Sequence, residues 1–329
     1  NSAFGHYALS ANTTGANNSA FGYNALLANT TGTGNVAVGY AALDAATTAD
    51  YNTALGYAAL GANTTGYSNV MVGANAGDAI TTGPLNVGVG HNALGTVVTG
   101  QENTGIGYNA LSLTTVSDNT GIGAYAGDAL TTGANNTCVG AYSLSAATTG
   151  ASNVMVGAWA GDVLTTGSDN TGIGIHSLGA LTTADYNTAV GSGALLLNTT
   201  GASNTAVGYL ALDANTTAAY NSAFGQNALG ANTTGSPNDA FGFAALGANT
   251  TGASNVAIGA YSLDANTTAS GNTAVGYGTL SQNQTGAQST AVGYAALNQA
   301  LEDNNTAVGY AAMQNCTSGE YNVAVGHAA

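Results

Sequence analysis

The chain has no lysine or arginine among its 329 residues, and this absence excludes several classes of function. Proteins that bind nucleic acid neutralise phosphates with cationic side chains, so that class is excluded. The lysine of a P-loop and the polybasic patches that attract anionic membranes are missing as well. The remaining charge is a net −15. Such a charge favours solubility and repels anionic surfaces.

Other residue types are nearly absent. Charged residues make up only 5% of the chain, and there are two prolines and two cysteines. No apolar run reaches the roughly 18 residues that a membrane-spanning helix needs. Cys138 and Cys316 lie in repeat units that are ten apart, so we expect no disulfide between them within one chain. Cys138 has the pattern of a small buried residue, whereas Cys316 falls in a predicted turn, where it could cross-link two chains.

What the chain does contain is a repeat of 17 residues with the consensus N-T-A-V-G-Y-x-A-L-x-A-N-T-T-G-x-x. Two copies are one residue shorter, which leaves 19 full repeats and an eight-residue stub. We number positions within the repeat from its first asparagine. The repeats begin at residues 1, 18, 35, 52, 69, 86, 103, 119, 136, 153, 170, 187, 204, 221, 238, 255, 272, 289, 305 and 322. No separate domain is visible, and the chain begins and ends inside the pattern. We therefore expect one continuous array over 1–329 that is a segment of a longer protein.

Two positions are nearly invariant. Position 5 is glycine in all 20 copies, which implies a positive φ or a backbone approach too close for a Cβ. The predicted structural turn glycines include Gly5, Gly22, Gly39, Gly56, Gly73, Gly123, Gly208 and Gly309. Position 1 is asparagine in every copy except Ser289. Stacked asparagines can bond to their own turn and to the asparagine of the next coil.

This pattern predicts an all-β fold, a parallel β-solenoid of about 19 coils. Positions 1–4 form a short β-prone run that ends at the glycine, positions 6–9 form a second run, and positions 12–15 have turn chemistry. A unit this short cannot bury a face alone, so equivalent strands must pair from coil to coil. A helical repeat is excluded, because such repeats need about 33–47 residues.

The pattern leaves the direction of the side chains open. Position 4 is bulky and apolar and position 3 is small, and adjacent strand residues cannot both point inward. Either the small residues fill a narrow coil and the bulky ones need partner chains, or the bulky ones form the core.

An exchange of large and small residues between two positions indicates more clearly which positions lie inside the coil. Gly77, Gly127 and Gly161 replace the usual leucine of position 9, and Ile80, Leu130 and Leu164 stand at position 12 of the same repeats. Positions 9 and 12 should therefore share one interior space.

Catalytic or metal-binding chemistry is not indicated, and we expect no enzyme and no cofactor. The histidines His6, His91, His176 and His327 lie on widely separated coils. The carboxylates form no pair on adjacent coils, and a regular coil offers no cleft in which two of them could face each other.

The Asn-Thr-Thr turns are the most suggestive surface. They match the N-glycosylation pattern, and the candidate residues are Asn12, Asn29, Asn63, Asn198, Asn215, Asn232, Asn249 and Asn266. The alternative is that asparagine and threonine only stabilise the turn. Stacked threonines could also bind ice, although two adjacent threonines cannot both face one plane. Tyrosine prefers position 6, and such a file could stack on sugars or only on itself.

Asn-Thr-Ala-Val-Gly at 187–191 and 305–309, with Tyr-Ala-Ala-Leu at 294–297, is similar to the head repeats of YadA-like trimeric autotransporter adhesins. The segments Gly208–Thr217 and Gly56–Gly66 resemble the tandem units of bacterial and phage tail-fibre-domain proteins even more closely. The resemblance implies left-handed parallel β-rolls that trimerise and bind host matrix or surfaces.

Together these observations predict a structural fibre or adhesin shaft that is extracellular or on the cell surface, not enzymatic, and decorated with glycans. The expected partners are other copies of the chain, as a trimer or an end-to-end filament, and glycans or environmental surfaces. The alternative is a solenoid that binds ice or polysaccharide.

Overall fold

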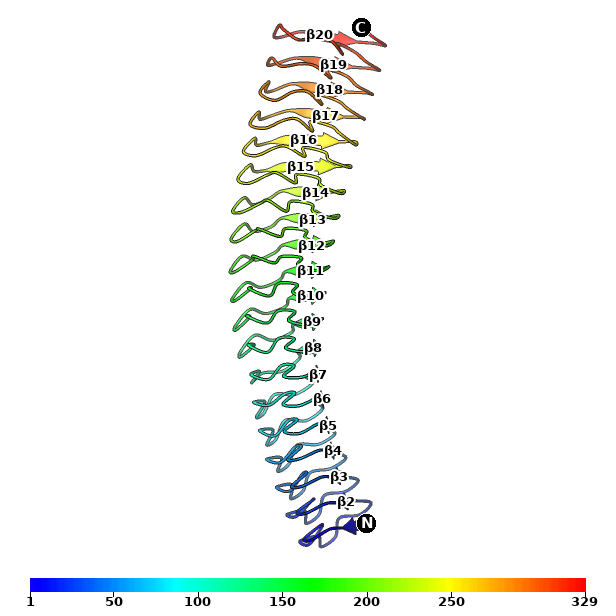
Figure 1. Ribbon diagram of the computed structural model, residues 1–329, viewed down its shortest axis with the longest axis vertical. Helices are drawn as coiled ribbons and strands as arrows, with labels where there is room; N and C mark the ends of the chain where they lie inside the picture. The colour runs from blue at the N-terminus through cyan, green and yellow to red at the C-terminus, as the bar shows by residue number, and fades with distance from the viewer. The chain divides into compact units, whose positions relative to one another are not determined.

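The computed structural model describes residues 1–329 and contains strands and turns but no helix, and therefore no helix that could cross a membrane. The chain divides into two compact units, Asn1–Ser168 and Asp169–Ala329. Each unit is a stack of coils with one short strand per coil, as Figure 1 shows. The predicted parallel β-solenoid is confirmed. The continuity of a single array over 1–329 stays a prediction.

The first unit holds β1 to β10: Ser2–Phe4, Ser19–Phe21, Val36–Val38, Thr53–Leu55, Val70–Val72, Val87–Val89, Thr104–Ile106, Thr120–Ile122, Thr137–Val139 and Val154–Val156. The second unit holds β11 to β20: Thr171–Ile173, Thr188–Val190, Thr205–Val207, Ser222–Phe224, Asn238–Phe241, Asn255–Ile258, Thr273–Val275, Thr290–Val292, Thr306–Val308 and Val323–Val325.

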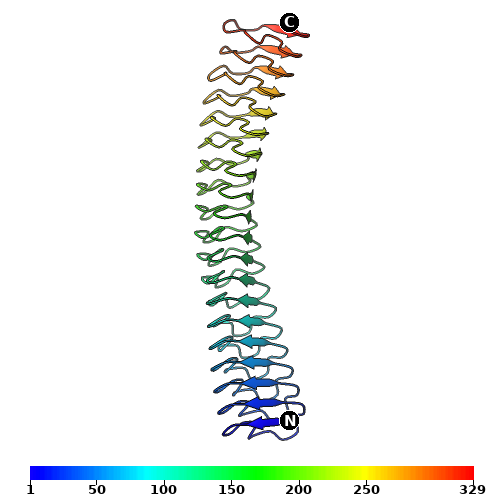
Figure 2. The ribbon, with the colours of Figure 1, turned by 45° about the vertical axis from the view of Figure 1, so that its right-hand side comes forward.

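Within each unit, every strand pairs in parallel with the equivalent strand of the next coil. In β2 and β3, Ala20 lies opposite Ala37 and Phe21 opposite Val38. The arrows in Figure 2 accordingly lie above one another within each unit. The shortened repeat at 103–118 keeps this register, because Thr104 of β7 still pairs with Thr120 of β8. The missing residue is therefore absorbed in the turn rather than in the sheet.

The strands settle which side chains point inward. Ala20 and Ala37 at position 3 are fully buried, whereas Phe21 at position 4 is 44% exposed. The small residues therefore fill a narrow coil and the bulky ones face outward, as the first of the two alternatives predicts. The alternative of a valine core is wrong. The core consists instead of position 3 together with the buried alanine of position 8 and leucine of position 9, such as Ala25 and Leu26.

The predicted second strand at positions 6–9 is wrong, because this segment is a series of turns. Asn24 and Leu26, at positions 7 and 9, have φ of 59° and 53°, which a strand does not allow. Their backbone N–H groups donate to His6 of the preceding coil and Ala42 of the following one. Leu27 donates back to Asn24 within the turn. The backbone is thus satisfied between coils without a second sheet.

The prediction for position 5 is confirmed. The eight predicted turn glycines have φ between +135° and +145°, a region that only glycine occupies readily. The close approach is present as well. A Cβ on Gly22 would lie 2.7 Å from the carbonyl carbon of Gly39 in the next coil. Position 5 thus requires glycine both for its positive φ and for the close approach of the next coil.

The shared interior of positions 9 and 12 is also confirmed. A Cβ on Gly127 would lie 3.0 Å from Cδ1 of Leu130. Cδ2 of Leu111, from the preceding coil, would be 2.9 Å away. Leu130 thus takes the volume that a leucine fills at position 9 of other coils.

Candidate functional surfaces

The most extensive candidate surface is the outward side of the first unit's sheet, formed by positions 2 and 4 of β1 to β10. We call it the outer strand face. Its exposed apolar side chains include Phe4, Phe21, Val36, Leu55, Val70, Ile106 and Ile122. The remaining positions of this face are serine, threonine or valine, and none is charged.

The acidic residues of the first unit all lie elsewhere in the coil. They occupy position 10 or the last two residues of a repeat, and they are Asp44, Asp50, Asp78, Glu102, Asp118, Asp128 and Asp162. The unit therefore separates its charge from its apolar surface. Sequence reasoning raised this face only as an alternative, since strand parity was open. The absence of acidic residues from positions 2 and 4 of these repeats is the sequence signal that favours an uncharged outer surface there.

A file of aromatic rings occupies position 6, two residues after the last strand residue of each coil. Tyr23, Tyr40 and Tyr57 stack nearly parallel, with ring centroids 5.4 and 5.3 Å apart. We call these three residues the tyrosine stack. The predicted self-stacking of tyrosine is confirmed. Both faces of Tyr40 lie against neighbouring rings, whereas the far face of Tyr57 has no ring against it, because the next coil has Ala74 at position 6. Within the stack, the faces of Tyr40 are therefore not open to a sugar.

Position 1 carries the predicted asparagine ladder. Nδ2 of Asn52 donates to Oδ1 of Asn35 at 3.2 Å and to the carbonyl of Gly66 at 2.9 Å. The backbone N–H of Asn52 also donates to Oδ1 of Asn35. The fully buried amide thus connects its own turn with the neighbouring coil.

The asparagines predicted as glycosylation sites lie inside the coil. Asn29, Asn63, Asn198, Asn215, Asn232, Asn249 and Asn266 are fully buried, and Asn12 in the first coil is half-buried. In most of them Nδ2, the atom that would carry the sugar, is a hydrogen-bond donor. In Asn232 it donates to the carbonyl of Gly235 and to Asn215. Burial and these hydrogen bonds leave the amides inaccessible in the folded coil, and N-glycosylation of the turns stays a prediction. Their asparagines form a second ladder.

The two threonines of each turn play different parts. The hydroxyl of Thr47 donates to the carbonyl of Thr64 in the next coil, and equivalent bonds recur at position 13. The threonine of position 14, for example Thr48 or Thr65, is exposed and its hydroxyl has no partner within the chain. Only one threonine per coil thus faces solvent, as the adjacency of the pair predicts.

Asn63 is the exception in the second ladder. It is fully buried, yet neither Oδ1 nor Nδ2 has a hydrogen-bond partner. Its neighbours at position 12 are Ala46 and Ile80, which offer no amide, and Asn63 also lacks the bond to its own turn that Asn198 makes with Gly201. The N-x-Thr pattern groups Asn63 with the other candidates, although the gap in the file of asparagines at position 12 is visible in the repeat.

Titratable groups do not gather into a site. No cluster of three or more histidine, cysteine or acidic side chains could hold a metal ion. Partial burial raises the pKa of five carboxyls at position 10, and hydrogen bonds from the backbone oppose this effect. The five are Asp44, Asp78, Asp128, Asp213 and Asp264. Cys138 is buried as predicted, and burial raises the pKa of its thiol to about 12, so it is not a nucleophile at neutral pH. Both cysteines are free.

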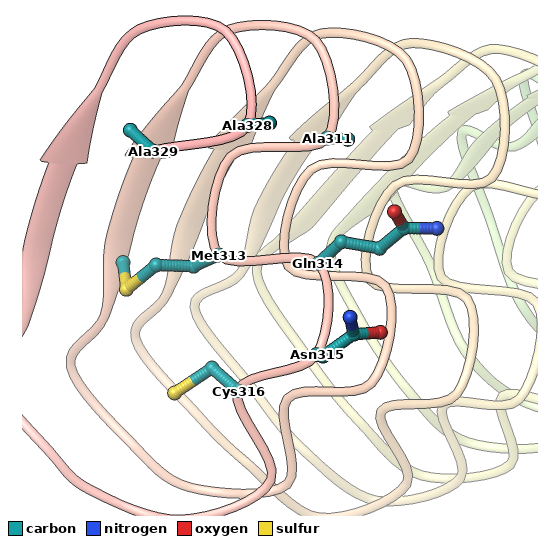
Figure 3. Close-up of a pocket in the computed structure, with 7 residues that line it drawn as sticks. All are labelled: Ala311, Met313, Gln314, Asn315, Cys316, Ala328 and Ala329. Atoms are coloured by element: carbon teal, nitrogen blue, oxygen red, sulfur yellow. The ribbon is translucent and has the colours of Figure 1, made fainter.

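One hollow of about 320 Å³ lies at the coil of residues 305–321. In Figure 3, Met313 and Cys316 point to the inner side of the coil, whereas Gln314 and Asn315 point away from it. Met313 and Cys316 occupy positions 9 and 12, which the next coil covers elsewhere in the unit. The hollow is thus the uncovered interior of a coil and has no convergent polar groups.

Comparisons with protein-family models, curated proteins and solved structures found no match. The resemblance to adhesin heads and tail fibres therefore stays a prediction from the repeat motif, and the surfaces themselves have to support any functional proposal.

Proposed function

We propose that the chain is a structural segment of an extracellular or cell-surface fibre or adhesin shaft, without catalytic activity, whose copies associate side by side. The repeat fold supports this proposal, because stacked coils provide length and regular surfaces without a cleft. The motif resemblance points the same way.

The outer strand face carries the proposal. Monomeric proteins rarely leave a long contiguous apolar patch in water. In a chain with 15 acids and no basic residue, contact between two copies is repulsive wherever the acids meet. The outer strand face offers apolar contact with no such repulsion. A second copy of the chain is therefore the partner that this face fits best.

A matched pair of variants tests the association. Leu55 at position 4 is 45% exposed on the outer strand face, and Thr65 is an exposed turn residue of the same coil. Leu55→Asp and Thr65→Asp add the same charge at these two places. We expect light scattering to show a multi-chain state for the original protein and for Thr65→Asp, and dissociation for Leu55→Asp. A monodisperse monomer of 31.7 kDa for the original protein would contradict the proposed assembly.

Ice binding remains a second candidate, and the exposed threonine file at position 14 favours it. A single column is a narrow surface, since the neighbouring hydroxyls of position 13 are bonded to the next coil. We therefore expect purified protein to show no thermal hysteresis and no shaping of ice crystals. Clear hysteresis at micromolar protein would place ice binding ahead of the fibre role.

A further inference from the structure

The tyrosine stack brings three phenol rings into a file that is both close-packed and open to solvent. Tyr23, Tyr40 and Tyr57 are 45%, 50% and 57% exposed, and neighbouring ring planes differ by only 6° and 8°. The second unit repeats the arrangement with Tyr277, Tyr294 and Tyr310, whose centroids are 5.4 and 5.2 Å apart. Because all these rings occupy position 6, their hydroxyls project in the same direction from successive coils.

We propose that the tyrosine stack is a site of oxidative cross-linking, at which a peroxidase and hydrogen peroxide join tyrosines of adjacent coils as dityrosine. The exposed ring edges carry the carbons next to the hydroxyl, which are the atoms that couple. Small rotations of two exposed side chains bring these carbons together, since the backbones already hold the rings in contact. The resulting bond ties coil to coil on the surface.

The reaction balances with hydrogen peroxide as the oxidant. Each of two phenols gives up one electron and one proton to the peroxidase and becomes a phenoxyl radical. The peroxide accepts the two electrons and two protons and leaves as two waters. The radicals join through a carbon–carbon bond between ring carbons adjacent to the oxygens. Each ring then moves the hydrogen of that carbon to its oxygen, which restores both phenols.

Exposure alone does not select these residues. Tyr51 is 64% exposed and Tyr67 is 49% exposed, but neither has another aromatic ring in contact. A radical on Tyr51 has no phenol partner in its own chain, whereas a radical on Tyr40 has one on each side. In dilute protein, coupling within the stack should therefore outcompete coupling at Tyr51 or Tyr67. Tyr125 and Tyr142 form a comparable stacked pair, with centroids 5.0 Å apart, and we expect them to couple as well. This chemistry does not depend on the chain's role, although its use in hardening a fibre rests on the proposed function.

The experiment treats dilute protein with horseradish peroxidase and limiting hydrogen peroxide, and maps the products by mass spectrometry. Trypsin has no cleavage site in this chain, but cleavage before aspartate separates residues 1–43 from residues 50–77. We expect these two fragments to become joined through Tyr40 and Tyr57, with the loss of two hydrogens. A Tyr23–Tyr40 bond should remove two hydrogens from fragment 1–43 alone, and fragmentation spectra distinguish it from a bond to Tyr7, whose ring meets that of Tyr23 edge-on at 6.4 Å.

Tyr40→Phe removes the central phenol and leaves Tyr23 and Tyr57 two coils apart, roughly 10 Å from each other at the usual strand spacing. We expect it to lower the yield of both products at least tenfold, whereas Tyr51→Phe should leave the yield unchanged. Both variants keep the ring, so circular dichroism should show the fold intact. Equal yields in the two variants, products that map to Tyr51 or Tyr67, or cross-links only between chains would overturn the proposal. The two products within one chain do not depend on whether copies assemble through the outer strand face, so their absence is distinguishable from a failure of the proposed assembly.

Discussion

At the scale of single residues, the coil uses positive φ at several positions and reserves glycine for one of them. Leu26 and Asn24 take φ near 55°, which a side chain tolerates at a modest cost. Burial of a leucine offsets that cost, since it contributes about 1.5–3 kcal/mol. Gly123 has φ of 135°, outside the region that other residues can adopt. This difference explains why position 5 alone is invariant.

We expect Gly123→Ala to destabilise the fold by about 1–3 kcal/mol. The new Cβ would lie 2.6 Å from the carbonyl of Gly140, in addition to the unfavourable φ. Gly278→Ala is the control. Gly278 has φ of 60°, its Cβ would meet nothing closer than 3.8 Å, and alanine occupies the same repeat position at Ala41 and Ala58. Urea unfolding measures both variants. Equal midpoints would contradict a special role for position 5.

Asn63 gives the opposite expectation. A buried amide without partners costs about 1–3 kcal/mol. Asn63→Ala removes this cost and reproduces the alanine of the preceding coil, Ala46, so we expect a gain in stability of about 1 kcal/mol. Asn232→Ala breaks a satisfied ladder, in which Asn232 also accepts a bond of 2.8 Å from Asn249. It should cost about 1–3 kcal/mol. Two losses of similar size would show that Asn63 is satisfied after all.

At the scale of the coil, the repeat predicted the features that depend on residue spacing. It did not predict the features that depend on the sign of the backbone angle φ. The 17-residue period, the strand before the glycine and the position 1 ladder were all predictable, because stacking forces equivalent residues together. The segment after the glycine was not. Tyr-x-Ala-Leu has the composition of a strand, and nothing in a single sequence reveals that Asn24 and Leu26 take left-handed conformations. The burial of the turn asparagines was missed for a related reason, since a sequence pattern for glycosylation carries no information on burial.

The compensation between positions 9 and 12 supports a double-mutant test in the first unit. Gly127→Leu alone should cost about 1–3 kcal/mol by overpacking against Leu130 and Leu111. Leu130→Ala alone should cost about 2–5 kcal/mol by leaving a cavity. The double variant moves the leucine to its usual position, so we expect a coupling of about 1–3 kcal/mol in its favour. Strictly additive effects would mean that the two side chains do not share their space.

At the scale of the whole molecule, charge is the dominant constraint. The chain has 15 acids and nothing to neutralise them, so the folded state concentrates repulsion that the unfolded chain spreads out. The first unit keeps its acids off the outer strand face, and the carboxyls of position 10 are partly buried without a cationic partner. Both features point to acid as a stabilising condition rather than a denaturing one.

We therefore expect the protein to become more stable as the pH falls from 7 toward 4.5. Burial raises the folded pKa of the position 10 carboxyls, such as Asp128, above the ordinary value of 3.8. Between the two values the folded state binds more protons than the unfolded state, so stability rises as the pH falls through this interval and is lost as the pH rises again. Relief of the general repulsion between carboxylates acts in the same direction.

Urea unfolding midpoints at pH 7 and pH 4.5 measure the effect. The protein should be dilute, because its net charge becomes small near the pI of about 4.1. Asp128→Asn provides the control: it should raise the midpoint at pH 7, where Oδ1 of Asp128 is buried without a partner, and reduce the gain in acid. A midpoint that falls on acidification would show that the position 10 carboxylates stabilise the coil in their charged form.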